Sequence, residues 1–136
     1  MIVGFTCGAF DLLHPGHLYL LKMASEHCDK LIVGLHTDPS IDRPEKNKPV
    51  QTTLERYIQL TSLPHVKQVV PYDTENDLEN LFSVWKLDKR FIGSDYMDTD
   101  ITGEDVCYQR NIEIIFIPRL HSWSSSGLRH RVREDI

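Results

Sequence analysis

The stretch IVGFTCGAFDLLHPGHLYLLKMASEHC, from Ile2 to Cys28, decides the fold. It opens with an apolar run of strand length, Ile2–Cys7, and from His17 to Cys28 its apolar residues recur at helical spacing. Between these parts stand Pro15 and Gly16. Proline at a first helical position gives up only an N–H that has no partner there, so the pair is typical of a helix start. The stretch therefore predicts a strand, a turn and a helix.

The same alternation runs through the rest of the chain, interrupted by one loop rich in proline and charge at Asp38–Pro49. Four further strands are predicted at Lys30–His36, Val66–Tyr72, Arg90–Gly93 and Ile112–Ile117. Three further helices are predicted at Thr53–Leu63, Glu75–Lys86 and Ser124–Glu134. Near-continuous apolar strands that alternate with helices indicate an α/β fold, a parallel five-stranded sheet with helices on both faces.

Length and composition limit the classes of protein. A chain of 136 residues predicts one domain, 1–136. The formal net charge of −5 disfavours nucleic acid as a partner, since a broad nucleic-acid footprint needs a basic surface. Three scattered cysteines argue against a disulfide framework and favour reduced thiols in a cytoplasmic protein. No secretory signal and no membrane span is expected.

Ligands of parallel sheets bind beyond the carboxyl ends of the strands, and the unusual residues of this chain fall in those segments. His14 and His17 would project from the first turn of the first helix, whose free N–H groups and dipole favour an anion. Two other interpretations are a helix cap with a solvated neighbour, and a metal site that lacks an evident third ligand. The dinucleotide fingerprint G-x-G-x-x-G is absent, which disfavours a dehydrogenase.

Cations and hydroxyls stand at other ends of the same sheet although the whole protein is acidic. They are Lys46, Lys48, Arg56, Arg119, Ser124, Ser125 and Ser126. Lysines in a proline-rich loop are usually solvated, and a serine run at a helix start is usually a cap. Taken together with the two histidines, the set favours a site for a triphosphate.

Five segments carry a resemblance over essentially the whole chain: GAFDLLHPGH, LIVGLHTD, KNKPV followed by ERY, GSDY, and PRLHSWSSSGLR. With these motifs the sequence resembles the HxGH nucleotidylyltransferases, most closely the glycerol-3-phosphate cytidylyltransferase type. The resemblance implies a Rossmann-like (HUP-type) homodimer. It further implies transfer of CMP from CTP to a small phosphorylated alcohol, such as glycerol 3-phosphate, with release of pyrophosphate and with Mg²⁺ accompanying the triphosphate.

The resemblance also implies roles for particular residues. The catalytic residues would be His14, His17, Lys46 and Lys48. The nucleotide would be bound by Gly8, Ala9, Phe10, Asp11, His14, Gly16, His17, Lys48, Arg119, Ser124, Ser125 and Ser126. The acceptor would be bound by Lys46, Arg56 and Asp38. Asp11 is a candidate neighbour of Mg²⁺, and no metal ligand is assigned.

The chain departs from the family pattern at Ala9, where a hydroxyl residue is usual, and in its closing motif, R-L-H-S-W-S-S in place of R-T-E-G-I-S-T. Two alternatives stay open. One is an adenylyltransferase that uses ATP on a sugar phosphate, because SDY and Gly103 echo the heptose-phosphate adenylyltransferases. The other is a nucleotide-binding regulatory module without turnover. A fragment of a class I aminoacyl-tRNA synthetase is disfavoured by the short acidic chain and the lack of a lysine-rich K-M-S-K-S-like loop.

Overall fold

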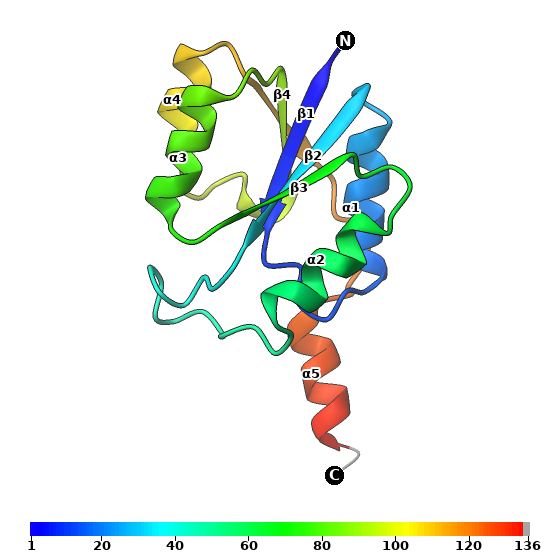
Figure 1. The fold of residues 1–136 in the computed structure, drawn as a ribbon. Coiled ribbons are helices and arrows are strands. Elements are labelled where there is room, and N and C mark those ends of the chain that lie inside the picture. Colours follow the sequence, from blue (N-terminus) through cyan, green and yellow to red (C-terminus); the bar gives the residue numbers. More distant parts are fainter. Residues whose placement is uncertain (135–136) are drawn as a thin grey trace.

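The computed structural model describes residues 1–134 and consists of a five-stranded parallel sheet with flanking helices (Figure 1). The strands are β1 (Val3–Gly8), β2 (Lys30–His36), β3 (Gln68–Tyr72), β4 (Lys89–Gly93) and β5 (Glu113–Ile117). The helices are α1 (Pro15–Ser25), α2 (Thr53–Thr61), α3 (Glu75–Val84), α4 (Glu104–Gln109) and α5 (Ser125–Glu134), with a 3₁₀ turn, η1, at Ser94–Tyr96. The predicted α/β class and the Rossmann-like parallel sheet are confirmed.

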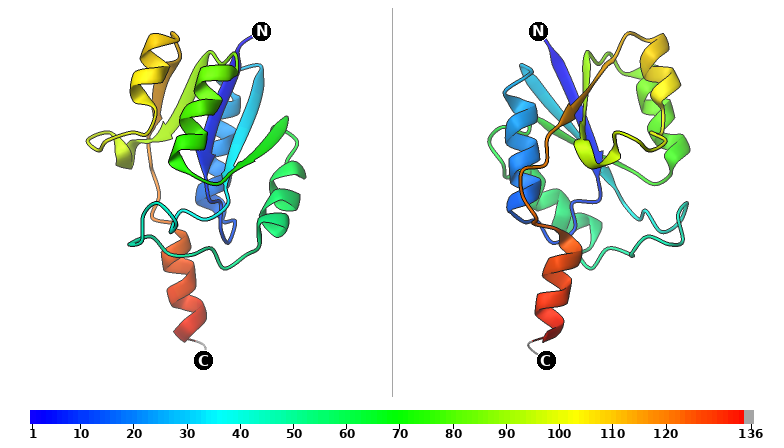
Figure 2. Two further views of the ribbon diagram at one scale, coloured as in Figure 1. Left: turned by 60° about the vertical axis from the view of Figure 1, so that its left-hand side comes forward. Right: turned by 180° about the vertical axis from the view of Figure 1, so that it is seen from behind.

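Helices cover both faces of the sheet, with α1 and α2 on one face and α3 and α4 on the other (Figure 2). Each face has its own apolar cluster. The first includes Leu21 of α1, Val33 of β2 and Leu60 of α2, and the second packs Phe5 of β1 against Phe82 of α3. Strands between two such clusters are apolar on both faces, which is why β2 reads as a continuous apolar run.

The strand order is β3-β2-β1-β4-β5, so the chain moves outward from β1 in one direction and then crosses to β4 on its other side. The carboxyl ends of β1 and β4 therefore border the point where the order reverses, the usual ligand position in such sheets. At the sheet edge, β3 tolerates Pro71 because an edge strand can lack a ladder N–H.

The first helix begins at Pro15, the start that the Pro15–Gly16 pair indicates, and ends at Ser25, whereas the apolar period predicts His17–Cys28. The apolar pattern predicts no element at α4, because this helix is too short and polar for an apolar period to show. Its N-cap, Gly103, has φ 78°, and a Cβ there would lie 2.7 Å from the Phe82 ring. Glycine is thus required for the backbone conformation and for close packing.

The last helix, α5, projects from the carboxyl end of the sheet and buries none of its residues (Figure 1). The domain prediction extended to residue 136, and residues 135 and 136 lie outside the described part. None of the helices within residues 1–134 combines the length and the apolar character that a membrane crossing would need.

Candidate active site

A cavity of about 810 Å³ opens at the carboxyl end of the sheet. Its wall contains the residues of the first turn that the sequence analysis selected: Gly8, Ala9, Phe10, Asp11, His14, Gly16 and His17. Lys46, Arg119 and the three serines Ser124–Ser126 join them from distant parts of the chain. Most of the predicted site residues thus surround one cavity.

The two histidines cap the first helix with one ring nitrogen each. The Gly16 N–H donates to His14 Nδ1 at 3.0 Å, and the His14 N–H donates to His17 Nδ1 at 3.2 Å. This reciprocal pair is a capping box in which imidazoles replace the usual hydroxyl and carboxylate. The helix-cap interpretation of His14 is therefore correct, and among residues 1–134 Nε2 of neither ring takes part in a hydrogen bond.

Nitrogens that accept a hydrogen bond carry no proton, so each neutral ring has its proton on Nε2. The rings are stacked, with centroids 3.8 Å apart. Burial, followed by the nearby His14, lowers the pKa of His17 to about 3. Burial also lowers the pKa of His14, with smaller contributions from His121 and Arg119. At neutral pH the pair therefore offers two uncharged N–H donors beside a helix N-terminus.

The turn before the helix has an unusual backbone. Phe10 and Leu12 have φ values of 50° and 52°, in the left-handed region that residues with a Cβ rarely adopt. Phe10 is buried beside the His17 ring, with centroids 5.4 Å apart, and the Leu12 N–H donates to Gln51 Oε1 at 2.8 Å. Contacts from another loop thus maintain a strained turn at the edge of the cavity.

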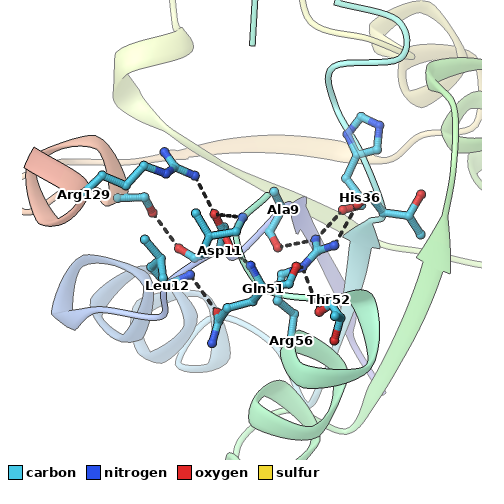
Figure 3. Close-up of polar contacts among 11 residues, drawn as sticks. Ala9, Asp11, Leu12, His36, Gln51, Thr52, Arg56 and Arg129 are labelled. Carbon is cyan, nitrogen blue, oxygen red and sulfur yellow. Dashed lines mark hydrogen bonds and ion pairs between the residues drawn. The ribbon is translucent and has the colours of Figure 1, made fainter. Parts of the chain in front are cut away.

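Asp11 joins three parts of the chain (Figure 3). Its carboxylate accepts the N–H groups of Val50 at 2.8 Å and Gln51 at 2.9 Å, and it forms an ion pair with Arg129 of α5. Its carbonyl oxygen accepts from Ser125 Oγ at 2.7 Å. Burial opposes ionisation of Asp11, but the two N–H groups and Arg129 outweigh it, so its pKa is lowered. Both carboxylate oxygens already have partners, so Asp11 has little capacity left for a metal ion.

Arg56 does not bind an acceptor, contrary to the prediction, because its guanidinium is buried within the protein. Its side chain is 1% exposed and absent from the cavity wall. It donates to the carbonyl oxygens of Ala9, His36, Thr37, Gln51 and Thr52 and to Thr53 Oγ1 (Figure 3). These contacts use its donors and connect the first turn to the end of β2 and the start of α2. Arg56 is a structural residue.

The loop after β2 places its predicted residues unequally. Lys46 lies in the cavity wall, whereas Lys48 is exposed and outside it. Asp38 was predicted to bind the acceptor, but it also lies outside the wall. Its carboxylate accepts from the N–H and the hydroxyl of Ser40, at 3.0 and 2.6 Å, which is a local turn contact.

The segment before α5 supplies cations and hydroxyls. Arg119 pairs with Asp95 at 2.7 Å and donates to the Trp123 carbonyl oxygen at 2.7 Å. Ser124 Oγ accepts from the Gly127 N–H at 2.9 Å, which is a cap contact. Ser125 Oγ donates to the Asp11 carbonyl oxygen, and Ser126 lies in the same cavity wall.

Two residues of this region were missed by the sequence analysis. His121 lies in the cavity wall, and its Nδ1 accepts the Trp123 N–H at 3.2 Å. A Cβ on Gly16 would lie 2.7 Å from the His14 ring and 2.8 Å from the His121 ring, so glycine lets both imidazoles approach the helix start. Arg129 was the second. Its four-residue spacing from Ser125 places both on one face of a helix, a signal that could have identified it.

Comparison with known proteins shows the family of the chain. The profile of the cytidylyltransferase-like family matches residues 5–131. The chain belongs to the cytidylyltransferase-like family. This confirms the resemblance noted from the sequence and places the chain among the nucleotidyltransferases.

The HldE proteins that the chain matches are longer than this chain. The chain is 45% identical over 131 residues to the bifunctional protein HldE of Caulobacter vibrioides, covering 96% of this chain and 27% of that protein. It is 34% identical over 127 residues to HldE of Hyphomonas neptunium, covering 93% of this chain and 26% of that protein. The chain therefore spans about a quarter of the length of these relatives.

Solved structures show the same fold at lower identity. A lipopolysaccharide core biosynthesis protein from Thermoplasma volcanium superposes with a TM-score of 0.67 at 23% identity, covering 91% of this chain and 99% of that one. Pantothenate synthetase from Thermus thermophilus superposes with a TM-score of 0.71 at 16% identity, covering 99% of this chain and 64% of that one.

Proposed function

We propose that the protein transfers a nucleotidyl group from a nucleoside triphosphate to the phosphate of a small phosphomonoester and releases pyrophosphate. The observation that carries this proposal is the pair of neutral imidazoles that cap α1 with Nδ1 and keep Nε2–H free at the cavity. Preorganised N–H donors at a helix N-terminus stabilise the negative charge that develops on the phosphates in the transition state.

In the proposed reaction an oxygen of the acceptor phosphate attacks the α-phosphorus. A new O–P bond forms, the bond to the bridging oxygen breaks, and pyrophosphate leaves in line with the attack. The nucleophile is already ionised at neutral pH, so catalysis consists mainly of positioning and of charge stabilisation. His14 and His17 would donate to the α- and β-phosphates.

The cations have complementary roles in this scheme. Lys46 would hold the acceptor phosphate near the α-phosphate, because it lies in the cavity wall on the loop after β2. Arg119, Ser126 and the N-terminus of α5 would hold the β- and γ-phosphates. Lys48 would contribute only if its exposed loop moves toward the nucleotide.

We propose that Mg²⁺ enters with the triphosphate and is held mostly by phosphate oxygens, where it neutralises phosphate charge. Residues 1–134 contain no cluster of three or more carboxylate, imidazole or thiolate groups placed to hold a metal ion. Asp11 is the carboxylate nearest to the two histidines in sequence, and its oxygens already bind the Val50 and Gln51 N–H groups and Arg129. The protein's own contribution would therefore be to orient the phosphates.

For the nucleotide and acceptor, the first candidate is CTP with a small phosphorylated alcohol such as glycerol 3-phosphate, which the family description and the first motif favour. The second is ATP with a sugar phosphate. The relatives that favour this second candidate are up to 46% identical to the chain, and they carry the name HldE and not that of a cytidylyltransferase.

Pyrophosphate release from CTP and from ATP, measured across a panel of phosphorylated alcohols and sugar 1-phosphates, tests the proposal. We expect turnover with one nucleotide and at least one class of acceptor, and its loss in His14→Asn. Faster turnover with ATP for every active acceptor would replace the first candidate by the second. Nucleotide binding without pyrophosphate release from any pair would instead identify a regulatory module.

A further inference from the structure

Arg90 on β4 is buried without a counter-ion. Its side chain is 4% exposed, and its Cζ lies 4.6 Å from the centroid of the Phe82 ring. Nη1 donates to the Thr102 carbonyl oxygen at 2.5 Å, whereas Nε is buried and has no partner. Within residues 1–134 no carboxylate lies within 4.0 Å of its guanidinium. A buried cation is costly unless an anion compensates it, so this arrangement calls for a partner.

The same cavity borders this buried arginine. Arg90 belongs to the cavity wall, together with His36 and Tyr72 at the carboxyl ends of β2 and β3. The His36 and Tyr72 rings are stacked with centroids 4.6 Å apart, and His36 Nε2 is buried with no partner. Burial raises the pKa of the Tyr72 hydroxyl, and the charge of Arg90 opposes that shift by a smaller amount.

The acidic group in this part of the wall is already neutralised. Glu75 lines the same cavity, and its carboxylate forms an ion pair with Arg43 at 3.3 Å. The Arg90 subsite, defined as Arg90, His36 and Tyr72, therefore combines an uncompensated positive charge with an unpartnered imidazole nitrogen. A neutral hydroxyl could accept a hydrogen bond there, but it would leave the charge uncompensated.

We propose that the Arg90 subsite binds a second anionic group of the acceptor, a carboxylate or a phosphate, besides the phosphate that attacks the nucleotide. This inference rests on the proposed function, because it assigns the acceptor to the same cavity. Arg90 could instead serve only to fasten the segment before α4 through the Thr102 carbonyl. In that case Arg90 would not distinguish acceptors that carry a second anion from acceptors that lack one, so the test compares these two kinds of acceptor.

Three acceptors that differ at one carbon provide the test: glucose 1-phosphate, glucuronate 1-phosphate and glucose 1,6-bisphosphate. We expect kcat/KM to be about 10- to 100-fold higher for one of the two acceptors with a second anion, the scale of one charge-assisted contact in a buried site. The carboxylate and bisphosphate arms distinguish the two anions. In Arg90→Met this preference should disappear, and in the exposed control Arg110→Met it should persist.

Calorimetric titration of the same three acceptors without nucleotide separates this inference from the proposed function. Tighter binding of an anionic acceptor by the wild type, lost in Arg90→Met, would support the subsite even if no turnover is found. Should that variant fail to fold, the wild-type preference and the charge-conserving Arg90→Lys decide the matter. Equal affinity or equal kcat/KM of the wild type for all three acceptors would overturn the inference.

Discussion

At the scale of single residues, His14 uses its two ring nitrogens for different purposes, and the two can be separated. In His14→Asn the amide oxygen can still cap α1, because asparagine is a good N-cap, but the Nε2–H donor is gone. We expect kcat to fall by roughly 10²–10³-fold, the scale seen when one preorganised donor is removed. The free energy of unfolding should stay within about 0.5 kcal/mol of the wild type.

His14→Ala is the matched comparison, since it removes both functions. It should lose the same activity and in addition about 1 kcal/mol of stability, the usual value of a helix cap. Urea unfolding and pyrophosphate release, measured on both variants, check these outcomes. Normal turnover in His14→Asn would mean that the histidine serves the helix alone.

The lowered pKa of His17 predicts how stability depends on pH. With a folded pKa of about 3 and an ordinary value of 6.5, the unfolded chain binds the proton first as the pH falls. The stabilisation by neutral His17 is therefore complete above pH 6.5 and is lost as the pH falls from 6.5 toward 3. Between pH 6.5 and pH 5 this amounts to about 1.5 kcal/mol for one group.

His17→Gln should flatten this dependence, because glutamine can accept the His14 N–H but does not titrate. Exposed His130→Gln is the control and should keep the wild-type slope. Asp11 does not interfere, since its lowered pKa affects stability only at more acidic pH. Free energies of unfolding at pH 7, 6 and 5 test the prediction, and equal slopes for His17→Gln and the wild type would refute it.

At the scale of elements, Arg56 connects the first turn, the end of β2 and the start of α2. Arg56→Met would leave several buried carbonyl oxygens without donors, so we expect a loss of about 3 kcal/mol or more of unfolding free energy. Exposed Arg110→Met should change stability by about 0.5 kcal/mol or less. If Arg56→Met were as stable as the control, its contacts would not determine the shape of the site.

The elements themselves could be predicted well where apolar patterning is strong. The five strands follow from apolar runs such as Lys30–His36, because both faces of those strands are buried. Boundaries were less accurate, since α1 depends on a cap made by His14 rather than on apolar period. No apolar pattern predicts α4, whose start depends on the left-handed backbone conformation of Gly103.

At the scale of the whole molecule, the family resemblance predicts a homodimer. Trp85 and Trp123 are apolar candidates for its interface. Trp123 is 50% exposed, but Trp85 is partly buried against the apolar cluster beneath α3 and α4. Light scattering at micromolar concentration should give twice the mass of one chain. The mass of a single chain under those conditions would remove the prediction.

The sequence predicts correctly those site residues that follow the carboxyl ends of strands. His14, His17, Lys46 and Arg119 reach one cavity because carboxyl ends of parallel strands share an edge. Arg56 could not be assigned correctly, because its sequence position gives the same signal whether the side chain faces a ligand or five carbonyl oxygens. The ring nitrogens of His121 likewise acquire their arrangement only through tertiary contacts.

The attachment of α5 has a consequence for local unfolding. The helix buries no residue, and its contacts with Asp11 come from Ser125 and Arg129, within its first two turns. Such a unit should open at a free energy well below that of the sheet, so its amides should exchange with solvent deuterium early. Opening of α5 would remove Ser125 and Ser126 from the cavity wall while the sheet stays intact. A triphosphate bound against that wall would oppose the opening, so slowed amide exchange in α5 would report occupancy of the site before any chemistry occurs.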